Sequence, residues 1–221
     1  SPFALTPGFE GPEQPHGAKP MEDPATGGWV APFIMAAINT KNVHRSNFLM
    51  GHPYGEDFVY DEMVMTGPGE AGEKAAMALA SSDAMAGDDG PKPGEGPSKE
   101  ERETGFYDIL FIGETADGQS FRASVQGDKD PGYGSTSKMI AEAALCLTDE
   151  AKALPGGIYT PAAAFEANGE RSRSRTPGSF AAAAMVAFRL AAVPPENVPF
   201  MARTRPFTRG AGAPVFDFTC S

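Results

Sequence analysis

The stretch TGPGEAGEK, residues 66–74, has the spacing that comes closest to a known binding motif. Gly67, Gly69 and Gly72 follow the pattern G-x-G-x-x-G, between a strand-like segment and a helix-like segment. In dinucleotide-binding proteins this pattern lets the backbone turn tightly and hold a pyrophosphate at a helix N-terminus. The chemistry in question is therefore hydride transfer with a nicotinamide cofactor.

The residues around these glycines argue against a pyrophosphate site. The preceding strand carries Asp61 and Glu62 and alternates in polarity, as a half-exposed strand does, whereas the motif requires a buried parallel strand. Glu70 and Glu73 would place negative charge against the phosphates. Pro68 also stiffens the turn. We therefore predict that this stretch is a strand-to-helix corner and not a cofactor site.

No other pattern in the sequence is typical of a catalytic centre. His16, His44 and His52 lack the spacing of metal ligands, so we expect no metal site. The sequence has no glycine-flanked turn of the kind that carries a hydrolase nucleophile. A formal net charge of −11 argues against a nucleic-acid partner, because such proteins need a basic surface.

The hydrophobic pattern predicts an α+β fold. Two strand-like segments flank Asp117 and Gly118, which predicts an antiparallel hairpin with a tight turn. The element order is typical of helices packed on one face of a mixed, largely antiparallel sheet. The predicted strands cover 56–67, 106–115 and 120–127, and the predicted helices cover 32–46, 73–86, 134–151 and a short segment that begins at Pro161.

The first predicted helix carries polar residues that a binding site could use. Pro32 suits its first position, and its apolar front half should be buried. Asn39, Thr40 and Arg45 lie in its polar back half, which must emerge at a surface or a cleft.

A second group of candidates lies at the start of the helix predicted over 134–151. Tyr133 precedes this helix, and Ser135 or Thr136 is its expected cap. Lys138 follows in the first turn, where a positive charge opposes the helix dipole unless an anion or a carboxylate lies nearby.

Composition divides the chain into three regions. Residues 1–28 are rich in proline and should be extended. Residues 29–166 form the predicted α+β domain. Within it, residues 87–103 lack apolar anchors and should form a mobile loop, either a lid over a cleft or a solvated insertion. Residues 167–221 form a tail of different composition.

Several long stretches are more specific than composition: GGWVAPFIMAAINTKNVHRSNFLMG, YGEDFVYDEM, DDGPKPGEGPSKEERE, GDKDPGYGSTSKMIAEAALCL and GGIYTPAAA. Together they resemble the C-terminal portion of the saccharopine dehydrogenase-like oxidoreductases, in the branch that includes trans-acting enoyl reductases. The resemblance covers residues 4–166.

The resemblance implies a role beside a cofactor domain. Family members have an N-terminal Rossmann domain that binds NAD or NADP, and a second, α+β domain that supplies substrate contacts and a dimer surface. The family's dinucleotide fingerprint does not occur in this sequence, so the chain resembles the substrate-side domain. It is not expected to bind the cofactor tightly or to be active alone. The expected reaction of the intact protein is hydride transfer to an enoyl or imine bond of a small-molecule or acyl substrate.

The candidate residues gain possible roles from this resemblance. Asn39, Thr40 and Arg45 could reach a nicotinamide amide or a phosphate, or they could be an ordinary solvated helix end. Tyr133 is a candidate proton donor, and Lys138 a candidate for the same site. The alternative function is a non-catalytic dimerisation or binding module, or a truncated and inactive product.

The tail departs from the family pattern after the motif TPAAA. The lysines end at Lys152, whereas most arginines lie at or after Arg171. A reading-frame shift in GC-rich DNA would produce such a change, and a divergent tail is the alternative. The longest apolar run, residues 180–193, is too short to span a bilayer and contains Arg189. With no signal-peptide pattern at residues 1–20, we expect a cytoplasmic protein.

Overall fold

The computed structural model describes residues 1–82, 96–115, 119–149 and 154–165. The tail predicted over 167–221 and the turn at Asp117 and Gly118 lie outside these residues. Within them the helices are α1 (Ala36–Leu49), α2 (Gly69–Ser81), α3 (Lys99–Thr104), α4 (Gly134–Asp149) and α5 (Pro161–Phe165). The strands are β1 (Met21–Asp23), β2 (Gly28–Pro32), β3 (Met63–Gly67), β4 (Tyr107–Glu114) and β5 (Ser120–Gly127).

The described strands form two sheets, and every pairing in them is antiparallel. One sheet has the order β1-β2-β3, with an irregularity in register at Trp29 and Val30. The other is the hairpin of β4 and β5, which pair from Tyr107–Gly127 to Glu114–Ser120. The α+β class and the hairpin predicted from the sequence are thereby confirmed.

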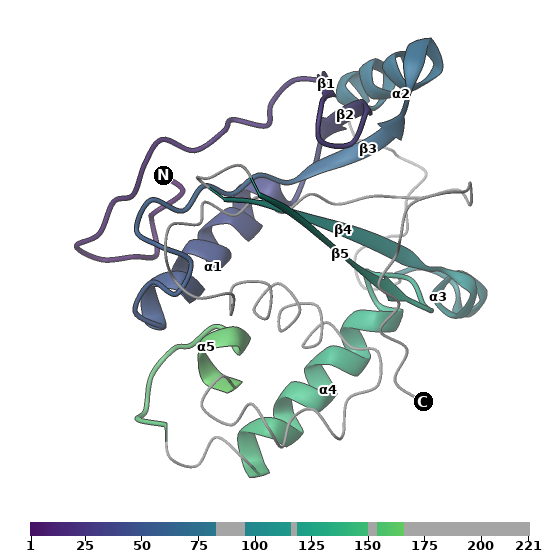
Figure 1. Ribbon diagram of the computed structural model, residues 1–221. Coiled ribbons are helices and arrows are strands. Elements are labelled where there is room, and N and C mark those ends of the chain that lie inside the picture. The colour runs from purple at the N-terminus through teal and green to yellow at the C-terminus, as the bar shows by residue number, and fades with distance from the viewer. Residues whose placement is uncertain (83–95, 116–118, 150–153, 166–221) are drawn as a thin grey trace.

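Two apolar clusters join these elements. Val30, Met63 and Met65 of the first sheet pack against Leu110 of β4. Phe58 and Tyr60, just before β3, pack against Phe111 of β4. Figure 1 shows the hairpin crossing the middle of the molecule, with α2 beside the first sheet and α4 and α5 on the other side. The N-terminal segment runs along the outside of α1.

The first helix begins four residues later than predicted. Pro32 does not start it but ends β2, because residues 28–32 pair with strands on both sides. The expected burial of the helix is also reversed. Ile38, near its start, is 52% exposed, whereas His44 and Asn47 in its polar half are buried. The polar half therefore faces the protein, where hydrogen bonds satisfy it.

The strand predicted over 56–67 is shorter, because only Met63–Gly67 pair with β2. The prediction that this segment is half-exposed was wrong for Asp61 and Glu62, which are buried. The following helix starts at Gly69 rather than at residue 73. Its first turn therefore contains the last two glycines of the motif.

Capping groups explain two further differences. Part of the loop predicted over 87–103 is α3, which begins with a capping box formed by Ser98 and Glu101. The start of α4 is held by Asp130, whose carboxylate accepts hydrogen bonds from the N–H groups of Gly132, Tyr133 and Gly134. The expected helix start at Pro161 is confirmed.

Candidate functional site

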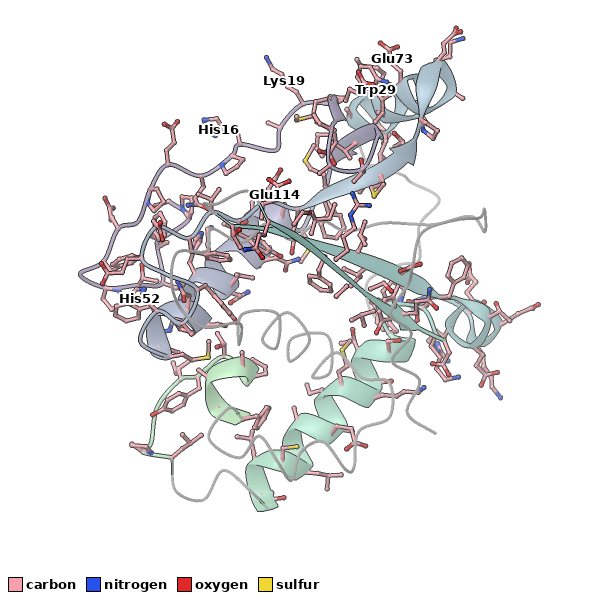
Figure 2. The ribbon with its side chains drawn as sticks, viewed as in Figure 1. His16, Lys19, Trp29, His52, Glu73 and Glu114 are labelled. Carbon is pink, nitrogen blue, oxygen red and sulfur yellow. The ribbon has the colours of Figure 1, made fainter. Side chains whose placement is uncertain are left out.

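The G-x-G-x-x-G stretch forms the predicted strand-to-helix corner. Gly67 and Gly69 have φ values of 102° and 65°, which favour glycine. A Cβ on Gly72 would lie 1.9 Å from the carbonyl oxygen of Gly67, so the helix touches the strand there. Thr66 donates from its hydroxyl to the carbonyl of Gly72 at 2.8 Å. Figure 2 places Trp29 of β2 and Glu73 of α2 at this end of the molecule.

A buried polar cluster lies between α1 and the segment before β3. The side-chain amide of Asn39 donates to Glu62 Oε2 at 2.9 Å, and the Tyr60 hydroxyl donates to Glu62 Oε1. Burial raises the pKa of Glu62, against the lowering effect of these two hydrogen bonds, and the neighbouring Asp61 carboxylate raises it further. Burial, together with the Glu62 charge, also raises the pKa of Tyr60 well above its usual value.

Gln14 organises a second buried group beside the first. Its side-chain N–H groups donate to the carbonyls of Pro12 and Phe58, which fixes the orientation of the amide. Its Oε1 accepts from the backbone N–H of Tyr60 at 2.9 Å and lies 3.0 Å from His44 Nε2. Because Oε1 can only accept, His44 Nε2 carries a proton in this arrangement. Burial lowers the pKa of His44 from 6.5 to about 4, so the ring is neutral at pH 7.

A cleft of about 720 Å³ opens beside this cluster. The N-terminal segment forms one wall, and the first turns of α1 form the other. Asp61 lies in the wall and is 8% exposed, and its pKa is raised by burial. Thr40 and Lys41 also line the cleft, as does His16, which Figure 2 shows on the N-terminal segment. Asp61 is thus a buried carboxyl that faces an accessible space, which suits hydrogen bonding or proton transfer.

The three residues predicted on the first helix lie in different surroundings. Thr40 lines the cleft, and Asn39 lies in the buried cluster, one residue away. Arg45 donates from Nη1 to the carbonyl of Leu5 at 2.8 Å and from Nη2 to that of Ile158 at 3.3 Å. It therefore ties the N-terminal segment and the segment before α5 to α1.

Tyr133 and Lys138 lie at the start of α4, beside α3. The Tyr133 ring is 58% exposed. Lys138 forms an ion pair with Asp128 at 3.1 Å. The carboxylate that the sequence requires near this lysine is thus provided by the chain itself. Figure 1 shows this region at the opposite end of the hairpin from α1, so the two predicted groups do not share one site.

Comparison with known proteins gives similarity to one named group. A protein of Mycobacterium tuberculosis provisionally named as a trans-acting enoyl reductase is 37% identical over 157 residues, which cover 63% of this chain and 38% of that protein. The trans-acting enoyl reductases of Mycobacterium bovis and Mycobacterium ulcerans are both 32% identical, over 69% and 63% of this chain. This similarity supports the resemblance to trans-acting enoyl reductases that the sequence stretches indicated.

The chain spans about two fifths of the length of these curated relatives, 38% in one case and 40% in another. No protein-family model matches it, and no solved structure matches it. Among the described residues, no helix is long and apolar enough to cross a membrane. The same residues contain no group of three or more histidine, cysteine or acidic side chains placed to hold a metal ion.

Sequence reasoning missed the central members of the cluster. Gln14, Asp61 and Glu62 were not predicted as site residues, although Asn39 and Thr40 beside them were. The available signal was two adjacent carboxylates inside the aromatic stretch DFVYDEM. If the segment is assumed to be a strand of alternating polarity, these two carboxylates are predicted to be exposed. Their burial can be predicted only when the amide donors on the facing helix are known.

Proposed function

We propose that this chain is the substrate-side part of an NAD(P)-dependent enoyl reductase. The similarity to trans-acting enoyl reductases over 157 residues at 37% identity is the observation that supports this proposal. In such a reaction the reduced nicotinamide supplies a hydride to the carbon–carbon double bond of an enoyl substrate, and a proton completes the reduction. The contribution of this chain would be to hold the substrate.

The described residues are a poor fit for the dinucleotide itself. The glycine corner is closed by its own backbone, since Gly72 touches the Gly67 carbonyl. Glu10, Glu13 and Asp61 give the cleft an acidic lining that disfavours phosphates. Tight binding of the cofactor would therefore belong to the remainder of a longer protein.

The predicted residues keep separate proposed roles. Thr40 would contact the substrate from the cleft wall, and Asn39 would hold Glu62 in the buried cluster beside the cleft. Arg45 has guanidinium N–H groups beyond the two that bind carbonyls, so a phosphate contact remains its proposed role in the longer protein. Tyr133 would act as a proton donor and Lys138 as its neighbour, but only if another part of the longer protein completes a site at the start of α4.

The direct test uses the complete reading frame around this sequence. The encoded protein should oxidise NADPH in the presence of a trans-2-enoyl thioester, and the present 221-residue chain should not. NADPH oxidation by the present chain alone would contradict the proposal that cofactor binding requires another part of the protein. Reading the genomic DNA on both sides gives a first answer, because a dinucleotide fingerprint should lie upstream in frame.

Tyr133→Phe tests the proton-donor role in that complete protein. Its turnover should fall about tenfold or more, whereas Tyr107→Phe serves as a control on the β4 strand. Equal turnover of both variants would remove Tyr133 from the reaction.

A second function is favoured by exposed apolar side chains. Ile140, Leu145 and Leu147 on α4 are 69%, 57% and 53% exposed, and Ile38 on α1 is 52% exposed. Exposed apolar surface of this kind marks contacts with other proteins, so a homodimer or a non-catalytic binding module is the alternative. Sedimentation should then show self-association that depends on concentration, and a monomer at all concentrations would argue against it.

A further inference from the structure

The cleft beside Asp61 has mainly apolar walls. Phe3 and Pro12 line it from the N-terminal segment, Phe33 from just before α1, and Ala36 and Ala37 from the first turn of α1. Its volume of about 720 Å³ lies in the range of small-molecule pockets, roughly 300–1,000 Å³. Apolar walls of this kind gain free energy when they cover an apolar ligand. The cleft therefore suits an aliphatic chain.

The charges around the cleft disfavour an anionic ligand. Asp61 is buried in the wall, and Glu10 and Glu13 add two carboxylates from the N-terminal segment. Lys41 and His16 are the basic side chains in the lining. A carboxylate ligand that entered would lose its hydration beside a carboxyl that is already desolvated, which is costly. The lining therefore disfavours a carboxylate ligand.

Hydrogen bonds and close packing hold the N-terminal wall of the cleft in place. Gln14 holds the N-terminal segment through the carbonyls of Pro12 and Phe58 and the N–H of Tyr60. Gly17 lies so close to Asp61 that an added Cβ would be 3.1 Å from Oδ1. A preformed cleft lowers the entropic cost of binding.

We propose that this cleft binds the uncharged acyl chain of a thioester and that Asp61 excludes fatty carboxylates from it. The proposal rests on the proposed function, since it names the part of the enoyl substrate that this chain would hold. Asp61 acts here through its position in the wall, which a carboxylate ligand cannot approach without repulsion.

Three probes separate the acyl chain from its charge. S-dodecanoyl-N-acetylcysteamine is a neutral thioester, dodecanoate is its anionic counterpart, and N-acetylcysteamine lacks the chain. Calorimetry with the present chain should show binding of the thioester and none of N-acetylcysteamine, with dodecanoate weaker by about tenfold or more. Equal affinity for the thioester and dodecanoate would overturn the charge selection.

A pair of tryptophan variants locates the binding. Ala37 lines the cleft and is exposed, so the indole of Ala37→Trp should occupy part of it and weaken thioester binding by about tenfold or more. Ile38 is on the same helix but does not line the cleft, so Ile38→Trp is the matched control and should leave binding unchanged. Equal thioester affinity of the two variants would place the ligand elsewhere and overturn the proposal.

A second pair tests the role of Asp61. Asp61→Asn removes the buried charge and keeps the shape, so the preference for the thioester over dodecanoate should fall, with the part due to Glu10 and Glu13 remaining. Asp57→Asn removes an exposed carboxylate from the same segment and should preserve the selectivity. Circular dichroism of all four variants checks that they fold. The Asp61 pair still decides the charge selection if Ala37→Trp does not fold, and unchanged selectivity in Asp61→Asn would overturn it.

These results can be separated from the proposed function. If the complete protein reduces an enoyl thioester with the same KM in the wild type and in the Ala37→Trp variant, the proposal for the cleft is wrong and the proposed reductase function stands. If the thioester binds in the cleft but the complete protein reduces no enoyl thioester, the proposed binding site stands and the proposed reductase function is wrong.

Discussion

Asn39 of α1 donates a hydrogen bond to Glu62, 2.9 Å away, and so joins the helix to the segment that leads into β3. Glu62 also accepts the Tyr60 hydroxyl, so both of its oxygens have donors although the side chain is 5% exposed. Asp61, the next carboxyl along the chain, faces the cleft instead. The two adjacent acidic residues therefore lie in different surroundings, since Glu62 connects two elements and Asp61 lines the cleft.

Glu62→Gln should make the protein more stable at neutral pH. Because burial raises the pKa of Glu62 above 4.5, the folded state binds this proton more readily than the unfolded state does. Its contribution to the free energy of unfolding is therefore highest below pH 4.5 and falls as the pH rises through the folded-state pKa. Urea unfolding from pH 4 to pH 8 should show the advantage of Glu62→Gln growing with pH. The exposed Glu56→Gln is the control, and a constant difference from wild type would contradict the burial argument.

His44 should contribute the opposite pH dependence. Its pKa falls from 6.5 in the unfolded chain to about 4 when folded, so protonation favours unfolding as the pH drops through this range. The wild type should lose up to about 3 kcal/mol through this group between pH 7.5 and pH 4. His44→Phe keeps the ring contacts with Phe3 and Phe58 but cannot titrate. Its unfolding free energy should fall less steeply over this interval, and parallel pH profiles would exclude a buried neutral His44.

The fold was predictable where local signals agree. The hairpin of β4 and β5 has two strand-like segments with a turn sequence between them. Thr160 and Pro161, the predicted cap and first residue, stand at the start of α5. In these segments the backbone preference and the packing point to the same structure. Sequence reasoning therefore succeeded there without knowledge of the rest of the chain.

Prediction failed where pairing partners decide the structure. Pro32 looks like the first residue of a helix, but pairing with β1 and β3 on either side makes residues 28–32 a strand. The polar half of α1 looks solvated, but Gln14 and Glu62 bury it by satisfying His44 and Asn39. These partners are between 23 and 30 residues away in the sequence. Thr40 was predicted as a candidate because it lies in the polar half of the helix, whereas the position of Asp61 in a cleft could be seen only in three dimensions.

Gly72→Ala should be strongly destabilising, whereas Gly69→Ala should not. A Cβ at Gly72 would lie 1.9 Å from the Gly67 carbonyl oxygen, so the backbone must move and about 2–4 kcal/mol should be lost. Gly69 has φ 65° but nothing within 4 Å of an added Cβ, so only the strain of about 1–2 kcal/mol applies. Thermal unfolding of the two variants measures the difference. An equal loss of stability in the two variants would mean that the glycines are required for their backbone conformation and not for close contact between the helix and the strand.

Arg45→Met should loosen two segments that are far apart in the sequence. The guanidinium binds the carbonyls of Leu5 and Ile158, and these bonds at the protein surface should together contribute about 1–2 kcal/mol. Amide hydrogen exchange should therefore speed up near Leu5 and around residues 158–160 in the variant. Lys41→Met, one turn earlier on α1, is the control and should leave both segments unchanged. If exchange is unaffected by Arg45→Met but the complete protein loses affinity for NADPH, Arg45 is a phosphate ligand and not a tie between segments. If exchange speeds up in both segments and the affinity for NADPH is unchanged, Arg45 connects the two segments to α1 and does not bind phosphate.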